Sequence, residues 1–272
     1  MLFIGVKTDM NIYFSTNAME LGELHKFHDY IDEFEGKVGV ELFPRFHQKG
    51  FLEEFMAEKK NLKKIPFSCH GPYYESEYAA PADSEEYQHS IELLKQTLQE
   101  VRDCKPVYVV FHHNNGIVTP ETKKQKLLWA RAGYEDVKAI CDKENIPLVV
   151  ENVSLTCHQS MLFEEQEFID ECKRIQCPVL IDIGHANISG WNLRRMMEEL
   201  RDQIVSYHVH NNAGKKDDHN RIFCGTLDFE SFIEDYKRLT PDADIVLEYC
   251  PEAVKDIEET KKDIQYLISN CL

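Results

Sequence analysis

The sequence predicts an α/β protein that forms one closed (β/α)8 barrel over residues 1–272. Eight short apolar or β-branched runs alternate with longer amphipathic stretches up to the end of the chain. The runs are mostly apolar, as is typical of parallel strands that are buried on both faces. No linker sets off a second domain, and no glycine-rich phosphate loop follows a strand. The last two observations disfavour an open doubly wound sheet, which is the main competing fold.

The expected elements follow one another in alternation. The strands are expected at Leu2–Val6, Val38–Phe43, Ile65–Ser68, Val107–Phe111, Leu148–Val150, Val179–Ile181, Ile204–Tyr207 and Ile245–Leu247. Helices are expected near residues 17–34, 47–60, 84–104, 120–143, 164–175, 190–201, 228–238 and 251–270. Three of these have start signals, namely Thr119-Pro120-Glu121, the possible cap Asp228, and Pro251-Glu252.

The composition restricts the classes of function. The chain carries 31 Lys and Arg against 48 Asp and Glu, a formal net charge of −17, and this disfavours nucleic acid and membrane surfaces as partners. No apolar run approaches the roughly 20 residues of a membrane span. Polar residues interrupt the opening of the chain, so no secretory signal is visible. The nine cysteines are scattered and never spaced CxxC. This pattern predicts reduced thiols in a cytoplasmic protein.

Acidic and imidazole side chains lie at the ends of nearly every expected strand. Together with the loop after the seventh strand, these positions are Glu41, His70, His112, His113, Glu151, Asp182, His185, His208, His210, Asp217, His219 and Glu248. The carboxyl ends of barrel strands meet at one rim, where so many carboxylates would repel unless a cation neutralised them. Imidazoles with carboxylates and without thiolates select Zn²⁺, Mn²⁺, Co²⁺ or Fe²⁺ and leave open positions for water or substrate. The sequence therefore predicts a catalytic metal site at this rim.

Each of these residues also has a simpler interpretation. Asp182 alone could cap the following helix, and Glu41 alone could pair with Arg45. Cys69 and Cys224 flank the expected site without a clear relay of histidine and acid, so we interpret both as packing residues. Among the aromatic residues, Tyr73 is best placed to line a sugar-binding wall.

The strand-end motifs resemble a known superfamily. The matching pieces are SCHGPY, VVFHHN, VVENVS, IDIGHANI, YHVHNN, the DDH before the GTLDF stretch, and VLEY, which run from the third strand to the eighth. They are similar to the xylose isomerase-like TIM barrels, which unite sugar isomerases and epimerases with abasic-site nucleases of the endonuclease IV type (AP endonuclease family 2).

The resemblance implies two alternative metal sites. In the isomerases and epimerases, one divalent metal is held by the counterparts of Glu151, Asp182, His208 and Glu248, and the two glutamates act as acid and base. In the nucleases a three-zinc cluster is held by nine residues, whose counterparts are His70, His112, Glu151, Asp182, His185, His208, Asp217, His219 and Glu248. The expected cofactor is therefore Zn²⁺ or Mn²⁺, from one to three ions per chain. Substrate contacts are expected from His185, His210, Arg221 and Tyr73, although Arg221 could equally form a surface salt bridge.

Three departures favour the isomerases over the nucleases. Residues Gly5-Val6-Lys7-Thr8-Asp9 lack the His and Ser pattern of the nuclease, and His113 stands where the nuclease usually has Pro-Gly. The rim shows no Arg and Lys cluster suited to a duplex. We therefore expect a sugar or sugar-phosphate isomerase or epimerase acting through Glu151 and Glu248 on a small carbohydrate.

Two other functions stay open. The first is a zinc-dependent AP endonuclease or phosphodiesterase, and the second is a non-catalytic sugar-binding barrel. Homo-oligomerisation through the outer helices is left open as well.

Overall fold

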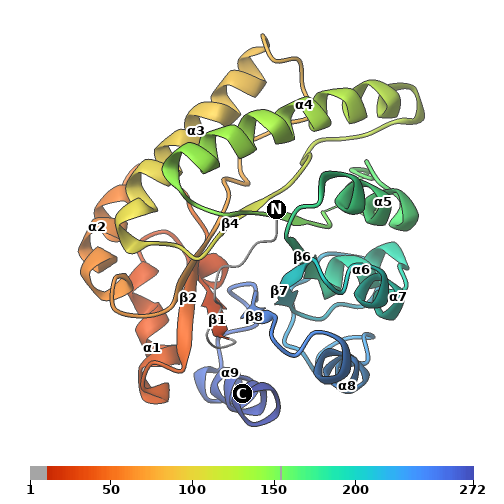
Figure 1. The fold of residues 1–272 in the computed structure, drawn as a ribbon. Helices are drawn as coiled ribbons and strands as arrows, with labels where there is room; N and C mark the ends of the chain where they lie inside the picture. Colours follow the sequence, from red (N-terminus) through yellow and green to blue (C-terminus); the bar gives the residue numbers. More distant parts are fainter. Residues whose placement is uncertain (1–10, 154) are drawn as a thin grey trace.

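The structure, a computed structural model, describes residues 11–153 and 155–272, which form a closed barrel of eight parallel strands (Figure 1). The strands are β1 (Ile12–Ser15), β2 (Val38–Leu42), β3 (Phe67–His70), β4 (Val109–Phe111), β5 (Leu148–Glu151), β6 (Val179–Asp182), β7 (Ile204–Val209) and β8 (Asp244–Leu247). They are paired in sequence order, and β8 closes the barrel by pairing with β1. The predicted (β/α)8 architecture is confirmed.

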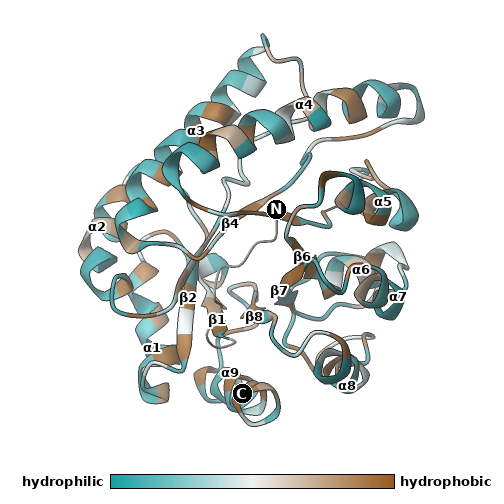
Figure 2. Cartoon of the chain, viewed as in Figure 1, coloured by the Kyte–Doolittle hydropathy of each residue, from teal (hydrophilic) through white to brown (hydrophobic). Residues whose placement is uncertain are grey.

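Helices surround the barrel and bury one face each against it (Figures 1 and 2). They are α1 (His28–Ile31), α2 (Phe51–Leu62), α3 (Glu85–Val101), α4 (Pro120–Glu144), α5 (Glu165–Ile175), α6 (Ile183–Ser189), α7 (Leu193–Glu199), α8 (Phe229–Leu239) and α9 (Ile257–Cys271). In α3, for example, Ile91, Leu94 and Leu98 are buried at helical spacing. The hydrophobic core therefore lies between the helices and the strands.

The start of the barrel differs from the sequence prediction. The strand expected at Leu2–Val6 lies outside the described residues, and β1 is formed by Ile12–Ser15, which the prediction assigned to no strand. The helix expected over residues 17–34 is a series of short turns, the 3₁₀ helices Leu24–Phe27 and Asp32–Phe34 around α1. A four-residue strand carries too little period-two pattern to be recognised beside a longer apolar run.

Two later helices also differ from expectation. The helix expected over 190–201 is the shorter α7, which starts after Asn192, and an unexpected helix, α6, precedes it and is ended by Gly190 in the left-handed region at φ 66°. The last helix begins at Ile257, where Asp256 caps it, and not at Pro251. The other two start signals are confirmed, since Thr119 accepts a hydrogen bond from the Thr122 amide and Asp228 from the Ser231 amide.

Among the described residues, no helix combines the length and the apolar character that crossing a membrane requires.

Candidate metal centre

The strand ends bring the predicted ligand residues to one rim. His70, Glu151 and Asp182 are the last residues of β3, β5 and β6, and His208 is the register partner of Asp182 on β7. A cavity of about 420 Å³ opens there. The predicted site residues that line it are His70, Tyr73, His112, Glu151, His185, Asp217, His219 and Glu248. Asp182, His208 and His210 lie beneath its floor and are fully buried.

The first ligand group consists of His70, His112 and Glu151. The Nε2 atoms of His112 and His70 lie 2.9 and 3.5 Å from Oε2 of Glu151. His70 donates its Nδ1 hydrogen to the carbonyl of Gly71 at 2.8 Å, and Nδ1 of His112 lies 2.9 Å from Oδ1 of Asn115. With both Nδ1 atoms engaged, the two Nε2 atoms are directed at the same carboxylate, as ligands of one cation would be.

The central group surrounds Nδ1 of His208. This nitrogen has no hydrogen-bond partner although it is buried. It lies 3.2 Å from Oε2 of Glu248, 3.5 Å from Oε2 of Glu151 and 3.9 Å from Oδ2 of Asp182. A buried nitrogen among three carboxylates, with no partner of its own, fits a cation ligand.

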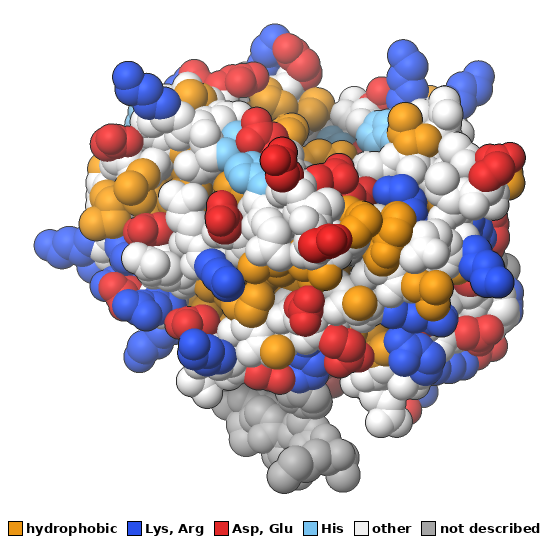
Figure 3. Space-filling view, turned by 90° about the horizontal axis from the view of Figure 1, so that it is seen from above, with side chains coloured by type: hydrophobic (Ala, Val, Ile, Leu, Met, Phe, Trp, Pro, Cys, Tyr) orange, Lys and Arg blue, Asp and Glu red, His pale blue; other side chains and the backbone are white. Residues whose placement is uncertain are grey.

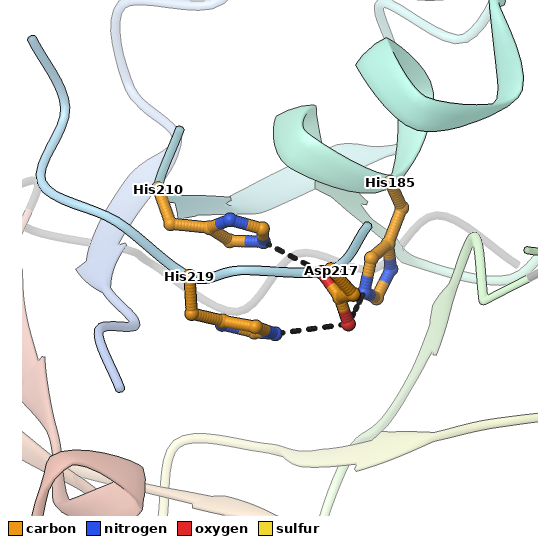
Figure 4. A group of neighbouring side chains, drawn as sticks. All are labelled: His185, His210, Asp217 and His219. Atoms are coloured by element: carbon orange, nitrogen blue, oxygen red, sulfur yellow. Dashed lines mark hydrogen bonds and ion pairs between the residues drawn. The ribbon is translucent and has the colours of Figure 1, made fainter. Parts of the chain in front are cut away.

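The third group lies in the loop after β7 and on α6. Oδ2 of Asp217 is 3.1 Å from Nε2 of His219 and 3.4 Å from Nε2 of His185, so the carboxylate lies between the two rings (Figure 4). Nδ1 of His219 donates to the carbonyl of Glu248 at 2.9 Å, which turns its Nε2 towards Asp217. Oδ1 of Asp217 is buried without a partner. The structure therefore brings together all nine predicted ligand residues in three adjoining groups.

Glu151 is shared by the groups. Its Oε2 faces His70, His112 and His208, and its Oε1 lies 3.3 Å from Nδ1 of His185. Both carboxylate oxygens thus lie within 3.5 Å of imidazole nitrogens, which come from β3, from the segment after β4, from α6 and from β7.

Opposite charges outweigh burial in setting the pKa values of Glu151, His208 and His219. Burial lowers the pKa of His208, but Glu248, Glu41 and Glu151 raise it well above its ordinary value. Burial raises the pKa of Glu151, but His112 and His208 bring it well below the usual range. For His219, Asp217 outweighs burial and raises the pKa to about 10. Without metal the raised pKa values of His208 and His219 favour imidazolium–carboxylate pairs there, so protons and cations compete for the same atoms.

Two predicted substrate contacts are placed elsewhere. The guanidinium of Arg221 pairs with Asp263 at 2.7 Å and Glu259 at 3.0 Å on α9, and it does not line the cavity. This is the salt bridge that the sequence left open. His210 is fully buried, with Nε2 3.1 Å from Oδ2 of Asp182 and its ring stacked on His219 at 3.9 Å. In the structure His210 therefore supports the cluster from below.

Three other residues also depart from their sequence interpretation. Glu41 pairs with His208 and not with Arg45. His113 does not lie at the rim, because its ring packs against Tyr134 and Phe163, and burial lowers its pKa to about 4. Cys69 is buried as expected, whereas Cys224 is exposed and packs no core.

Several lining residues were missed by the sequence analysis. They are Asn17, Glu20, Phe43 and Arg45, which follow β1 and β2, and Val153, Leu155, Cys250 and Pro251, which follow β5 and β8. Phe43 is the last residue of an expected strand and Arg45 follows it closely, so the strand-end rule could have pointed to both. It could not have pointed to Asn17, because the first strand was expected elsewhere.

Comparison with known proteins agrees with this geometry. Residues 35–270 match the family model described as the xylose isomerase-like TIM barrel. An uncharacterized protein of Sinorhizobium fredii is 25% identical over 150 residues, which cover 53% of this chain and 47% of that protein. The chain thus spans about half the length of this curated relative.

Solved structures share the fold over nearly the whole chain. A D-tagatose 3-epimerase-like protein superposes with a TM-score of 0.73 at 19% identity, covering 96% of this chain and 99% of the other. An IOLI protein with a bound zinc atom superposes with a TM-score of 0.74 at 13% identity, covering 97% of this chain and 99% of the other. An AP endonuclease of family 2 from Brucella melitensis superposes with a TM-score of 0.70 at 13% identity, covering 97% of this chain and 100% of the other. At such identities these structures show the fold alone, but the family model matches most of the chain. The chain therefore belongs to the xylose isomerase-like TIM barrel family.

Proposed function

We propose that this protein is a metal-dependent phosphoesterase that acts on a small substrate, such as a phosphorylated carbohydrate. The observation that carries the proposal is the position of Glu151, both of whose oxygens face imidazole nitrogens of three adjoining ligand groups. A site for one ion would leave most of these ligands without a role. Imidazole and carboxylate donors suit Zn²⁺ or Mn²⁺.

The residues fit several cations. His70, His112 and Glu151 would hold one ion, Glu151 with Asp182, His208 and Glu248 a second, and His185 with Asp217 and His219 a third. Two of the buried atoms without hydrogen-bond partners, Nδ1 of His208 and Oδ1 of Asp217, belong to these groups and support this assignment. Divalent cations held there would polarise a phosphoryl oxygen and lower the pKa of a water molecule.

The cavity favours a small substrate. Its volume of about 420 Å³ suits a sugar-sized molecule, and Phe43, Tyr73 and Tyr74 form an aromatic wall beside the ligand histidines. Arg45 is the one Lys or Arg among the described lining residues. On the face seen in Figure 3, Lys and Arg are scattered among Asp and Glu. A duplex, in contrast, needs several basic contacts to its phosphates.

Isomerisation or epimerisation of a sugar is the second candidate. The observation in its favour is that Glu151 and Glu248 both lie beside Nδ1 of His208, at 3.5 and 3.2 Å. This pair could hold one cation and exchange a proton with a carbon atom of the sugar, as the sequence predicted. A proton-transferring carboxylate needs an oxygen that is free to face the substrate, whereas both oxygens of Glu151 already lie within 3.5 Å of imidazole nitrogens. We therefore place hydrolysis first.

Paired assays distinguish the two reactions. The Zn²⁺- and Mn²⁺-loaded protein is tested on bis(p-nitrophenyl) phosphate, on sugar phosphates and on a panel of ketoses, together with the Asp217→Asn variant and an EDTA-treated control. We expect phosphoester hydrolysis that the variant loses. Ketose epimerisation that survives Asp217→Asn would contradict hydrolysis and assign the central group to proton transfer.

A further inference from the structure

Glu41 is a fully buried carboxylate beneath the metal centre and does not line the cavity. Its Oε1 lies 2.7 Å from Nε2 of His208, and its Oε2 accepts a hydrogen bond from the Ser68 hydroxyl at 3.1 Å. Glu41 and Ser68 are register partners on β2 and β3, while His208 reaches them from β7. Three separate strands therefore fix this contact.

The contact determines which nitrogen of His208 is free. Burial of an ionised carboxylate is costly unless it accepts hydrogen bonds, and an ionised carboxylate can only accept. Nε2 of His208 is the donor that such a carboxylate calls for at 2.7 Å, and Nδ1 then faces Glu248 and Glu151 at 3.2 and 3.5 Å.

Among the described ligand histidines, His208 is held differently from the rest. The Nδ1 atoms of His70, His185 and His219 lie within 3.0 Å of backbone carbonyls, and that of His112 faces the amide oxygen of Asn115. Only His208 has behind it a carboxylate that is not itself a predicted metal ligand, and it presents Nδ1 and not Nε2 to the site. A carboxylate behind a metal-binding imidazole fixes the ring and increases the basicity of the ligand nitrogen.

We propose that Glu41 is a positioning residue that locks His208 with Nε2 protonated and Nδ1 directed at the central cation. This role rests on the proposed function, because it presupposes that the central group binds metal. Glu41 itself touches neither the cation nor the substrate. Its expected effect is on the affinity of the central group.

Matched variants test the role through metal affinity. Glu41→Gln keeps the volume and an acceptor oxygen but loses the charge, Glu41→Met loses the acceptor, and Ser68→Ala is the control that leaves the Glu41–His208 contact in place. Competition with a chromophoric chelator measures the affinity for Co²⁺, and the visible Co²⁺ spectrum reports the ligand field. We expect a loss of about 10-fold to 100-fold in Glu41→Gln, a larger loss in Glu41→Met, and wild-type affinity in Ser68→Ala.

A second readout does not depend on metal. In the metal-free protein labelled with ¹⁵N-histidine, the Nε2 hydrogen of His208 should give a strongly downfield resonance, assigned by its absence in His208→Gln. We expect this resonance to persist in Ser68→Ala and to be lost in Glu41→Met. If Glu41→Met does not fold, Glu41→Gln decides through both readouts.

The failures are distinguishable. Wild-type protein that binds no Co²⁺ would overturn the proposed function and, with it, the role of Glu41. Normal binding by the wild type together with unchanged affinity in Glu41→Gln and Glu41→Met would overturn only the role of Glu41.

Discussion

The stability of the metal-free protein should fall as the pH rises above neutrality. The folded-state pKa of His219 is raised to about 10 by Asp217, against about 6.5 in an unfolded chain. The folded state therefore binds one more proton than the unfolded state between these values. A raised histidine pKa contributes stability that is complete below pH 6.5 and is lost as the pH approaches 10.

The size of the effect follows from proton linkage. One extra proton bound by the folded state makes the free energy of unfolding fall by about 1.4 kcal/mol per pH unit, or about 2 kcal/mol between pH 7.0 and 8.5. The pKa values of His185 and His208 are also raised well above their ordinary range, against the effect of burial, by Asp182 and Asp217 and by Glu248 and Glu41 respectively. The slope should therefore be at least that of one proton.

Urea unfolding followed by circular dichroism at pH 6.5, 7.5 and 8.5 in EDTA measures the slope. We expect the unfolding midpoint to decrease at each step, and His219→Gln to make the decrease less steep. With saturating Zn²⁺ the trend should reverse, because bound metal displaces these protons and binds more tightly as pH rises. A metal-free midpoint that is constant or rises from pH 6.5 to 8.5 would refute the imidazolium–carboxylate description of the cluster.

Three substitutions give further predictions. Asp217→Asn should remove one bound ion per chain with the fold retained, which elemental analysis and circular dichroism check together; an unchanged metal content would exclude Asp217 as a ligand. Glu151→Gln should abolish turnover and lower the metal-free melting temperature, because four imidazoles lose their shared anion, and activity near that of the wild type would remove Glu151 from the mechanism. Gly184→Ala should weaken metal binding, because its Cβ would lie 2.0 Å from the ring of His210. The control Gly190→Ala meets no atom within 4 Å and should cost only about 1 kcal/mol of backbone strain in thermal unfolding. Equal metal affinity in these two glycine variants would contradict a supporting role for His210.

Local pattern was sufficient for most of the barrel. Val38–Leu42 is buried along its length and Ile204–Val209 is buried except at the half-buried Val205, and both segments are rich in β-branched and apolar residues. The prediction for the first strand was wrong. Ile12–Ser15 forms a strand because it pairs with β2 and β8, and a four-residue sequence carries little sign of such long-range pairing. The segment after β6 forms two helices, α6 and α7, because Gly190 adopts the left-handed conformation between them. A single glycine in the sequence does not reveal that conformation.

The sequence predicted which residues belong to the site better than it predicted which residues they contact. The rule that barrel strands end at one rim was sufficient to group His70, Glu151 and Asp182. It did not show that Arg221 turns to α9, since Asp263 lies 42 residues further along the chain. Nor did it show that Glu41 faces inwards to His208, 167 residues away, because such pairs form only when the barrel closes.

The number of metal ions per chain tests the central claim most directly. It is measured by inductively coupled plasma mass spectrometry on protein purified without chelator or nickel affinity resin, then reconstituted with Zn²⁺ and desalted. Three adjoining ligand groups that share Glu151 predict close to three ions per chain, decreasing to about two in Asp217→Asn. A value of one that Asp217→Asn leaves unchanged, or a value of zero, would contradict a multinuclear hydrolytic centre.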